Sequence, residues 1–416
     1  MQVADIFQRA VGAAPVRMQA YDGSEAGSPE AEITLVVRSP RALAYLASAP
    51  GSLGLARAYV TGELEVQGEL YPALRGMADL ATNNIPRSEQ IAIARQLLGI
   101  RLRTKAPPPP EEVKPRGRLH SRKRDRKVIS HHYDVSNEFY EWLLGPSMAY
   151  TCAVFPKPDA DLEQAQEHKH ELVARKLGLQ PGMRLLDVGC GWGGMVMHAA
   201  ERHGVQAFGV TLSREQAEWA QKAIVERGLS DVAEVRHLDY RDVAESGFDA
   251  VSSIGLTEHL GRAQLPAYFA FLFGKLRPGG RLLNHCITQP DGHSPQTLDQ
   301  FIDRYVFPDG QLHSVGLLVS QMNDAGFEVR HEENFREHYA RTLALWSANL
   351  DAQWSHAVAE VGETRARVWR LYLAASQVGF ELNNIQLHQV LGVRLADGGQ
   401  SHMPWLPDWD ASAIRA

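Results

Sequence analysis

Cysteine is scarce in this chain of 416 residues. The three cysteines, Cys152, Cys190 and Cys286, are too few and too widely spaced for a disulfide framework or a cysteine-ligated zinc site. Long apolar runs are also missing. No segment is apolar over the length that a membrane span needs, and no hydrophobic secretion-type segment stands near the N-terminus. We therefore expect a cytoplasmic protein without a metal site.

An excess of charge of one sign is also absent. The formal net charge is only -6, from 43 basic and 49 acidic side chains, which argues against a general nucleic-acid binder. Hydrophobic residues make up 44% of the chain and charged residues 22%, as in ordinary globular proteins. The length suffices for two domains, each with its own core.

A glycine-rich turn dominates the sequence that is present. The segment Leu185 to Gly194, LLDVGCGWGG, has the pattern of an apolar strand, a tight turn and the start of a helix. Glycines such as Gly189 and Gly191 let the backbone turn sharply and approach a ligand closely. Because the same spacing fits the dinucleotide fingerprint, the turn alone does not separate a nucleotide site from other ligand sites.

Two neighbouring features favour S-adenosylmethionine at this turn. Asp187 places a carboxylate before the first glycine, which suits a ligand with a cationic end and would repel a pyrophosphate. The second strand ends in Thr211-Leu212-Ser213, without the acidic residue that an NAD ribose requires. We therefore interpret the turn as that of a methyltransferase.

The chain after residue 183 alternates between strand and helix patterns, as a parallel sheet requires. This predicts an α/β fold, a Rossmann-like, doubly wound sheet of the class I methyltransferase type with helical insertions. The expected strands are Arg184–Val188, Gln206–Leu212, Ala233–Leu238, Phe248–Ile254, Arg281–Thr288 and Phe327–Glu333. Gly279-Gly280 is expected to end a helix before its strand. The last part of the chain is predicted as long helices and a polar tail.

The first part of the chain is expected to be a separate, smaller α+β domain, residues 1–104, followed by a linker, residues 105–127, and a catalytic domain, residues 128–416. The linker begins with a stiff proline run, Pro107 to Pro110, and continues with eight basic residues opposed only by Asp125. Such a run is either a solvated tether or a segment attracted to an anionic bilayer. Nucleic acid is a third option, but no aromatic side chains interleave the charges.

Polar residues follow the other predicted strands at the edge of the sheet where ligands of such folds bind. Asp239 and Tyr240 follow the third strand and could hold an adenine by hydrogen bonding and stacking. Gln216 is either a ligand to ribose hydroxyls or a surface helix residue. Glu258 and His285 follow later strands, where a carboxylate and an imidazole suit acid/base or anion-binding work, although a histidine at a strand end is often structural.

Together these segments resemble the family of cyclopropane-fatty-acyl-phospholipid synthases and mycolic-acid methyltransferases. The resemblance covers roughly residues 128 to 395, and the N-terminal part resembles the extra domain of the phospholipid-modifying members. Seven segments in order carry it: HHYDVSNEFYEWLLGPSMAYTCAVF, LLDVGCGWGG, GVTLSREQ, DYRD, EHLG, HCIT and HYARTLALW.

The resemblance implies two ligand sets. S-adenosylmethionine would be held by Tyr150, Thr151, Gly189, Gly191, Thr211, Leu212, Gln216, Asp239 and Tyr240, in addition to Asp187 from the reasoning above. A bicarbonate ion would lie in a cage of Cys152, Glu258, His285, Ile287 and Tyr339. Three neighbours depart from the family pattern: Thr151 replaces a usual serine, Leu260 a valine or phenylalanine, and Cys286 a threonine.

The implied reaction is methyl transfer to the cis double bond of an unsaturated phospholipid acyl chain at the membrane surface, followed by deprotonation and ring closure to a cyclopropane. A hydride shift before deprotonation would instead give a 10-methylene chain, which a separate reductase would convert to a methyl branch. Two other hypotheses are a soluble small-molecule methyltransferase and an inactive lipid-binding protein. The sequence leaves open whether the protein is a monomer or a homo-oligomer.

Overall fold

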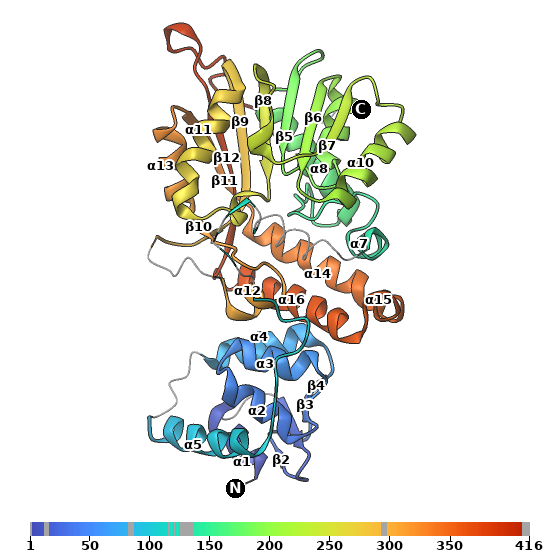
Figure 1. Cartoon of the computed structure of the whole chain (residues 1–416), viewed down its shortest axis with the longest axis vertical. Helices are drawn as coiled ribbons and strands as arrows, with labels where there is room; N and C mark the ends of the chain where they lie inside the picture. The colour runs from blue at the N-terminus through green and yellow to red at the C-terminus, as the bar shows by residue number, and fades with distance from the viewer. Residues whose placement is uncertain are drawn as a thin grey trace. The chain divides into compact units, whose positions relative to one another are not determined.

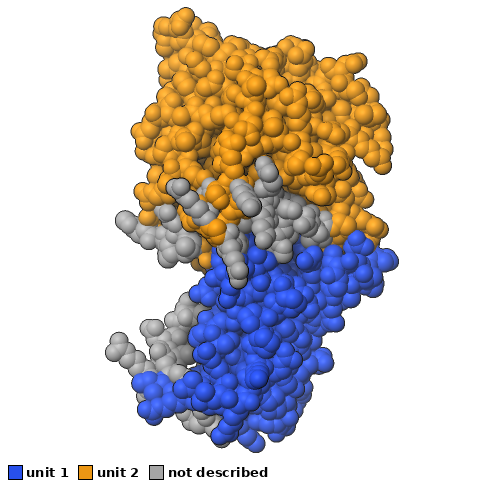
Figure 2. All heavy atoms as spheres, in the orientation of Figure 1, with its two compact units in different colours: residues 1–114, 299–308, 350–378 blue, residues 115–298, 309–349, 379–416 orange. Residues whose placement is uncertain are grey.

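The computed structural model describes residues 2–11, 16–81, 87–114, 117, 119, 121–122, 124, 136–292 and 298–409. Part of the basic run and residues 131–135, which open the aromatic-rich segment, lie outside the described residues. The chain forms two compact units, coloured separately in Figure 2. The first comprises Met1–Lys114, Asp299–Pro308 and Leu350–Val378, and the second comprises Pro115–Leu298, Asp309–Asn349 and Gly379–Ala416. Two segments from the expected catalytic domain thus belong with the N-terminal unit.

The N-terminal part of the first unit is a four-stranded sheet covered by helices. The strands β1 (Val16–Ala20), β2 (Glu25–Ala26), β3 (Ile33–Val37) and β4 (Leu64–Gln67) lie in the order β2-β1-β3-β4, with β1 parallel to β3. The helices are α1 (Val3–Val11), α2 (Pro40–Ser48), α3 (Ser52–Val60), α4 (Leu70–Ala81) and α5 (Arg87–Arg103). Ser39 caps α2 and Pro40 occupies its first turn, the signals expected for a helix start.

The proline run belongs to this unit and is not a free tether. The hydroxyl of Tyr45 donates to the carbonyl of Pro107 at 3.1 Å. Farther along, Arg57 and Glu112 form a buried bidentate ion pair with contacts of 2.7 and 2.8 Å. These contacts fix the chain as far as residue 112 against the N-terminal fold. The same unit includes α12 (Gln300–Tyr305), α15 (Trp354–Val361) and most of α16 (Glu363–Glu381).

The second unit is built on a sheet whose central strands are parallel (Figure 1). Its strand order is β11-β12-β9-β8-β5-β6-β7, and β10 pairs with β9. Strands β5 to β9 run parallel to their neighbours, whereas β12 is antiparallel to both β9 and β11. The bounds are β5 (Arg184–Val188), β6 (Gln206–Thr211), β7 (Ala233–His237), β8 (Phe248–Ile254), β9 (Leu276–Gln289), β10 (His313–Ser314), β11 (Glu328–Asn334) and β12 (Gln386–Val393).

Helices pack on both faces of this sheet, as the doubly wound prediction requires. One core joins α8 (Leu162–Leu177), α9 (Gly194–His203) and α10 (Arg214–Glu226) to the sheet, and the other joins α11 (Leu265–Lys275) and α13 (Val315–Asp324) to the opposite face. Asp161 and Gln164 form a capping box at the start of α8, which fixes the helix that carries two buried lysines. The remaining helices are α7 (Asn137–Leu144), α14 (Arg336–Ala352), and the short η1 (Tyr240–Asp242), η2 (Thr257–His259), η3 (Arg262–Gln264) and η4 (Asp397–Gly399).

Three expectations about this unit were wrong. Gly279-Gly280 does not end a helix, because α11 stops at Lys275 and both glycines lie within β9. The segment expected as one helix over Leu343–Ala357 divides between α14 and α15 near Gln353. The end of the chain is not only helices and a polar tail, since it supplies the strand β12. No helix in the described part of the chain is long and apolar enough to cross a membrane.

Candidate active site

The glycine turn connects β5 to α9 and is held against β6. The backbone amides of Gly189 and Cys190 both donate to the carbonyl of Val210, at 2.9 and 3.0 Å. Gly189 and Gly191 have φ angles of 75° and 55°, the left-handed region that favours glycine. A Cβ at Gly189 would lie 2.7 Å from Cδ1 of Leu256, whereas a Cβ at Gly191 would meet nothing within 4 Å. The turn therefore leaves room for a ligand beside Gly191.

A buried carboxylate and a buried ammonium lie beneath this turn. Asp187 accepts a hydrogen bond from Ser252 at 2.6 Å, and burial raises the pKa of Asp187 to about 6. Lys169, on α8, donates to the hydroxyl of Thr151 at 2.9 Å and lies 3.0 Å from Nε2 of His170. Burial lowers the pKa of Lys169 to about 8. The attraction between the two charges lowers the pKa of Asp187, so the lysine opposes the effect of burial on the carboxylate.

Gln216 is turned into the protein and is not a surface residue. It is buried, and its Oε1 accepts a hydrogen bond of 2.7 Å from Thr211 at the end of β6. Ser213 caps the start of α10 by accepting from the amide of Gln216. The partly buried Leu212 lies between them in sequence. The structure thus gathers the three expected cofactor contacts of this strand end in one turn.

Asp239 and Tyr240 are positioned by a neighbouring arginine and by aromatic rings. Both oxygens of Asp239 accept from Arg241, at 2.8 and 2.6 Å, and the hydrogen bonds from Arg241 outweigh burial and lower the pKa of Asp239. The ring of Tyr240 packs edge-on against Tyr268 and Phe271, with centroids 5.3 Å apart in each pair. The side chain of Asp239 is therefore already engaged, and its expected role toward an adenine stays a prediction.

Tyr150, Thr151 and Cys152 lie on one segment that is anchored from α8. The amide of Gln166 donates to the carbonyls of Ala149 and Thr151, at 3.1 and 2.9 Å. The ring of Tyr150 lies 5.4 Å from that of Trp346. These contacts fix the backbone of the segment next to the sheet edge that carries the glycine turn.

Cys152 meets the start of α14. Its buried thiol donates to the carbonyl of Ala153, and burial raises its pKa. The amide of Ala153 donates to the hydroxyl of Thr342 at 3.1 Å. Tyr339 lies one turn before Thr342, is buried, and packs its ring 4.5 Å from that of Phe380. The structure therefore brings the elements that carry Cys152 and Tyr339 together.

Glu258 is buried after β8 and is held by the backbone of β9. One carboxylate oxygen accepts from the amide of Ile287 at 2.8 Å, whereas the other, Oε2, is buried and has no partner among the described residues. Burial raises the pKa of Glu258 to about 7. The amide of Ile287 therefore binds the glutamate, which differs from the expected role of Ile287 as a direct member of an anion cage.

His285, two residues before Ile287 on β9, presents a second unpartnered buried atom. Its Nδ1 lies 3.2 Å from the amide nitrogen of Gln389, while its Nε2 has no partner among the described residues. Lys176 donates to the amide oxygen of Gln389 at 2.8 Å, so the NH2 end of that amide faces the imidazole. Because an amide NH2 only donates, Nδ1 must accept and Nε2 carries the proton. Burial, with the nearby Lys169 and Lys176, keeps the pKa of His285 well below its ordinary value.

Sequence reasoning missed Lys169, Lys176 and Gln389. Lys169 and Lys176 occupy the buried face of α8 together with Ala165, Leu172 and Val173, at spacings of three, four and seven residues. A lysine in an otherwise apolar stripe is a signal that the sequence did contain. Gln389 carried no such signal, because its strand was not recognised.

The three departures from the family pattern have defined surroundings. The hydroxyl of Thr151 accepts from Lys169. The sulfur of Cys286 accepts from the amide of Asn284 at 3.3 Å, and Leu260 is buried in the core under α11. Each substituted side chain is thus packed or hydrogen-bonded next to a residue of the candidate site.

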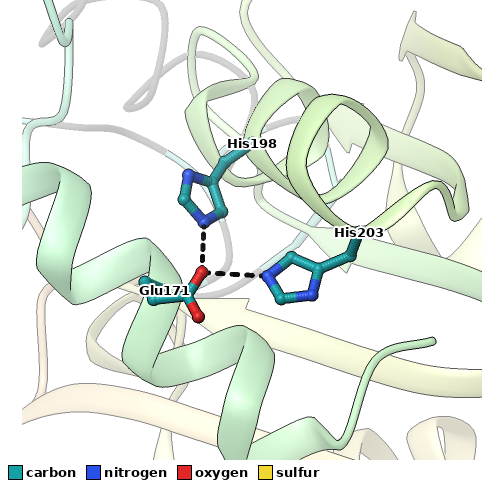
Figure 3. Close-up of side chains that lie close together, drawn as sticks. All are labelled: Glu171, His198 and His203. Atoms are coloured by element: carbon teal, nitrogen blue, oxygen red, sulfur yellow. Dashed lines mark hydrogen bonds and ion pairs between the residues drawn. The ribbon is translucent and has the colours of Figure 1, made fainter. Parts of the chain in front are cut away.

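A polar cluster links α8 to α9 behind the glycine turn (Figure 3). One oxygen of Glu171 lies 3.3 Å from Nε2 of His198 and 3.0 Å from Nε2 of His203, and the other accepts from Arg175 at 2.7 Å. The ligand types and the spread of at most 4.8 Å would suit a metal ion. No ion is needed to satisfy Glu171, however, because both its oxygens already have hydrogen-bond partners.

Comparison with known proteins places this geometry among lipid-modifying methyltransferases. Residues 120–390 match the family model described as mycolic acid cyclopropane synthetase. The chain is 53% identical over 98% of its length to a probable fatty acid methyltransferase of Mycobacterium tuberculosis, of which it covers 97%. It is 36% identical over 68% of its length to the cyclopropane-fatty-acyl-phospholipid synthase of Escherichia coli, of which it covers 71%.

A solved structure shows the same fold. A mycolic acid cyclopropane synthase, complexed with S-adenosylhomocysteine and CTAB, superposes on 64% of this chain and 98% of its own, with a TM-score of 0.61 and 33% identity. The methyltransferase fold predicted from the sequence is thereby confirmed.

Proposed function

The chain belongs to the mycolic acid cyclopropane synthetase family of S-adenosylmethionine-dependent methyltransferases, and from this premise we propose that it modifies the cis double bond of an unsaturated phospholipid acyl chain to a cyclopropane. Membership covers more than half of the chain and includes every candidate site residue. The proposal of a phospholipid substrate is supported by the Escherichia coli relative, whose name specifies one, and by the N-terminal unit that accompanies the catalytic one.

The cofactor fits the residues at the glycine turn. The open space beside Gly191 accepts a ligand where any side chain would project, and Asp187 offers a buried negative charge close by. When bound there, S-adenosylmethionine supplies a methyl group made electrophilic by its sulfonium. Tyr150 and Gln216 flank the same edge of the sheet and would orient it.

The observation that carries the proposed deprotonation step is the pair of unsatisfied buried atoms on Glu258 and His285. Buried polar atoms normally have hydrogen-bond partners, so such a pair indicates a missing ligand. The Nε2–H of His285 is a donor and the free oxygen of Glu258 is an acceptor. Bicarbonate matches this set, since it has carboxylate oxygens to accept one hydrogen bond and a hydroxyl to donate the other.

The protein side chains would then act as follows. His285 holds the anion by donating from Nε2, and Tyr339 is placed to donate from its hydroxyl. Glu258, when ionised, accepts the hydroxyl proton of the anion and so raises its basicity toward the acyl chain. An acyl cation in this site would lie among aromatic rings such as those of Tyr150 and Trp346, whose faces stabilise positive charge. Loss of the proton with ring closure completes a cyclopropane.

The alternative product is a 10-methylene acyl chain, formed when a hydride shift precedes deprotonation. The same residues serve both routes, and the packed substitutions at Thr151 and Cys286 are the ones that could alter how the cation is held. Neither route reduces the chain. A saturated methyl branch would therefore require a separate reductase.

The test is to incubate the protein with S-adenosylmethionine and vesicles of dioleoyl phospholipid and to analyse the lipid by proton NMR. The two products have equal mass, but ring methylene protons are strongly shielded and vinylidene protons are not. We expect shielded ring signals, absent with dipalmitoyl lipid and with Glu258→Gln. Vinylidene signals alone would replace the cyclopropane by the methylene product. Methylation of a catechol or an amine, without any lipid product, would overturn the proposal.

A further inference from the structure

Helix α5 of the first unit has two apolar faces. At about 100° per residue, Ile93, Leu97 and Ile100 fall on one side of the helix, and Ile91, Leu98 and Leu102 fall within about 40° of one another on the opposite side. Leu97 and Ile100 pack against the core of the unit. The other face is exposed: Ile91, Leu98 and Leu102 retain 53%, 52% and 80% of their accessible surface.

The second apolar face is unusual for the surface of this protein. A helix that covers a core needs one apolar stripe, with polar residues on the opposite side. Among the described residues, eight large hydrophobic side chains are exposed, and three of them form this one stripe. Packing within the unit therefore explains the inner face of α5 and leaves the outer face unexplained.

The outer face is surrounded by positive charge. From Ile91 to Lys105 the sequence contains Arg95, Arg101, Arg103 and Lys105 and no acidic residue. Arg95 lies beside the apolar stripe on the same face of the helix, and Arg95, Arg101 and Arg103 are exposed. No described residue forms an ion pair with any of these four side chains.

The basic run after the proline segment has less free charge than its sequence suggests. Arg122 pairs with Asp242 at 2.8 Å, and Arg124 forms a bidentate pair with Asp309 at 2.6 Å. These two arginines are neutralised within the second unit. The surface that combines exposed apolar side chains with unpaired positive charge is therefore α5.

We propose that the outer face of α5 binds this protein to an anionic phospholipid bilayer. Apolar side chains flanked by arginines are what an interfacial helix presents to a membrane, because the apolar groups enter the acyl region while the cations contact phosphates. The proposal rests on the proposed function in one respect, namely that the substrate is a membrane lipid. It adds the surface through which the enzyme meets that membrane.

The test uses the full-length protein and the double variant Leu98→Glu/Leu102→Glu. Binding is measured by sedimentation with vesicles of equimolar dioleoyl phosphatidylglycerol and dioleoyl phosphatidylcholine. We expect at least a tenfold loss of vesicle affinity, with unchanged circular dichroism and thermal midpoint. The matched control is Val225→Glu, which changes another exposed hydrophobic residue, 68% accessible, on α10 of the second unit and should bind as the wild type does.

A second variant, Arg95→Gln/Arg101→Gln, separates the charge from the apolar contribution. It should weaken binding at low salt and lose that effect at high salt, because salt screens the attraction to phosphate. Wild-type vesicle affinity in the leucine double variant would overturn the proposal. So would a wild-type dimer that the leucine substitutions dissociate, because the face would then bind a second copy of the chain.

Failure of this inference is distinguishable from failure of the proposed function. The leucine double variant should still modify unsaturated phospholipid dispersed in detergent, since α5 carries none of the candidate site residues. A protein that modifies dispersed lipid but does not bind the vesicles refutes only the role of α5. A protein that binds the vesicles through α5 but modifies no lipid refutes only the proposed reaction.

Discussion

The amide nitrogen of Gln389 lies 3.2 Å from Nδ1 of His285, across the antiparallel pair of β12 and β9. Because Lys176 holds the amide oxygen, Gln389 can only donate to the imidazole. Gln389 thereby sets the tautomer of His285 without contacting a substrate. Lys176 is in turn paired with Glu333 at 2.6 Å, so a short polar chain supports the one imidazole that the proposed anion site needs as a donor.

Replacing Gln389 by glutamate should reverse the tautomer. The new carboxylate would pair with Lys176 and accept a hydrogen bond from Nδ1 of His285, which leaves Nε2 without a proton at pH 8. We expect kcat to fall by on the order of 10², the usual effect of losing one donor to a bound anion, with little change in affinity for S-adenosylmethionine. Nitrogen-15 NMR of the labelled histidine reports the tautomer directly.

The control for this variant is Gln386→Glu on the same strand. Gln386 donates to Asn383 at an exposed position and has no contact with His285. It should leave both the NMR signature and the rate unchanged. A neutral His285 that keeps its proton on Nε2 in Gln389→Glu would show that the glutamine does not position it.

Glu258 should make stability depend on pH. Burial raises its pKa from 4.5 to about 7, so the folded protein holds a proton that the unfolded chain has released. The resulting stabilisation is present below pH 4.5 and is lost as the pH rises through 7. Relative to Glu258→Gln, the wild type should lose up to about 3 kcal/mol between pH 4.5 and 8. Calorimetry in buffers purged of carbon dioxide measures this difference.

Comparing the two proteins at each pH cancels other buried groups, including Asp187, whose raised pKa acts in the same direction. Parallel stability curves for wild type and Glu258→Gln would contradict the assignment. In turnover assays the same variant should lower kcat far more than affinity for S-adenosylmethionine, and added bicarbonate should restore part of the rate if anion affinity is what the variant loses.

Substitution of Gly191 should remove the cofactor without unfolding the sheet. Gly191→Val places a side chain where no protein atom lies within 4 Å, so the fold has room for it but a bound ligand does not. The matched control is Gly228→Val, whose φ of 68° imposes similar backbone strain at an equally open position away from the site. Both variants should lose roughly 1–2 kcal/mol of stability. Only Gly191→Val should lose S-adenosylmethionine binding in calorimetry.

Glu171 should stabilise the junction of α8 and α9. Its hydrogen bonds, first that from His198 and then those from Arg175 and His203, lower its pKa, so its contribution is present above about pH 4.5 and is lost in acid. Glu171→Gln should cost about 1 kcal/mol at pH 7, a modest value because solvent screens this partly exposed cluster. Glu218→Gln, at an exposed ion pair on α10, should cost nothing measurable in thermal denaturation. Equal midpoints for wild type and Glu171→Gln would show that the cluster is not structural.

Local patterns sufficed for the central strands and for the glycine turn. β5 and β8 occupy the residues predicted from their apolar runs, because a buried parallel strand is written continuously in the sequence. β12 was missed because the segment QLHQVLGV mixes buried polar and apolar residues. Its polar members His388 and Gln389 are buried among partners that only the folded sheet supplies.

Non-local contacts account for the other differences. The sequence gives no sign that residues 299–308 and 350–378 fold with the N-terminal unit, since that association depends on contacts hundreds of residues apart in the chain, such as that of Arg367 with Glu65 at 3.0 Å. The same holds for the amide of Ile287, which was expected to bind a ligand and instead binds Glu258. A motif identifies which residues gather at a site, but not which of them bind each other.

The position of β12 near the end of the chain has a consequence for biosynthesis. A ribosome completes the glycine turn, Glu258 and His285 long before it reaches Gln389, so the nascent protein has its cofactor turn before the imidazole has its final proton arrangement. Translation beyond residue 393 is needed before the sheet can close around that strand. Chains that end early would therefore retain the five parallel strands and yet carry an incomplete proton-accepting centre, which keeps unfinished polypeptides from acting on lipid.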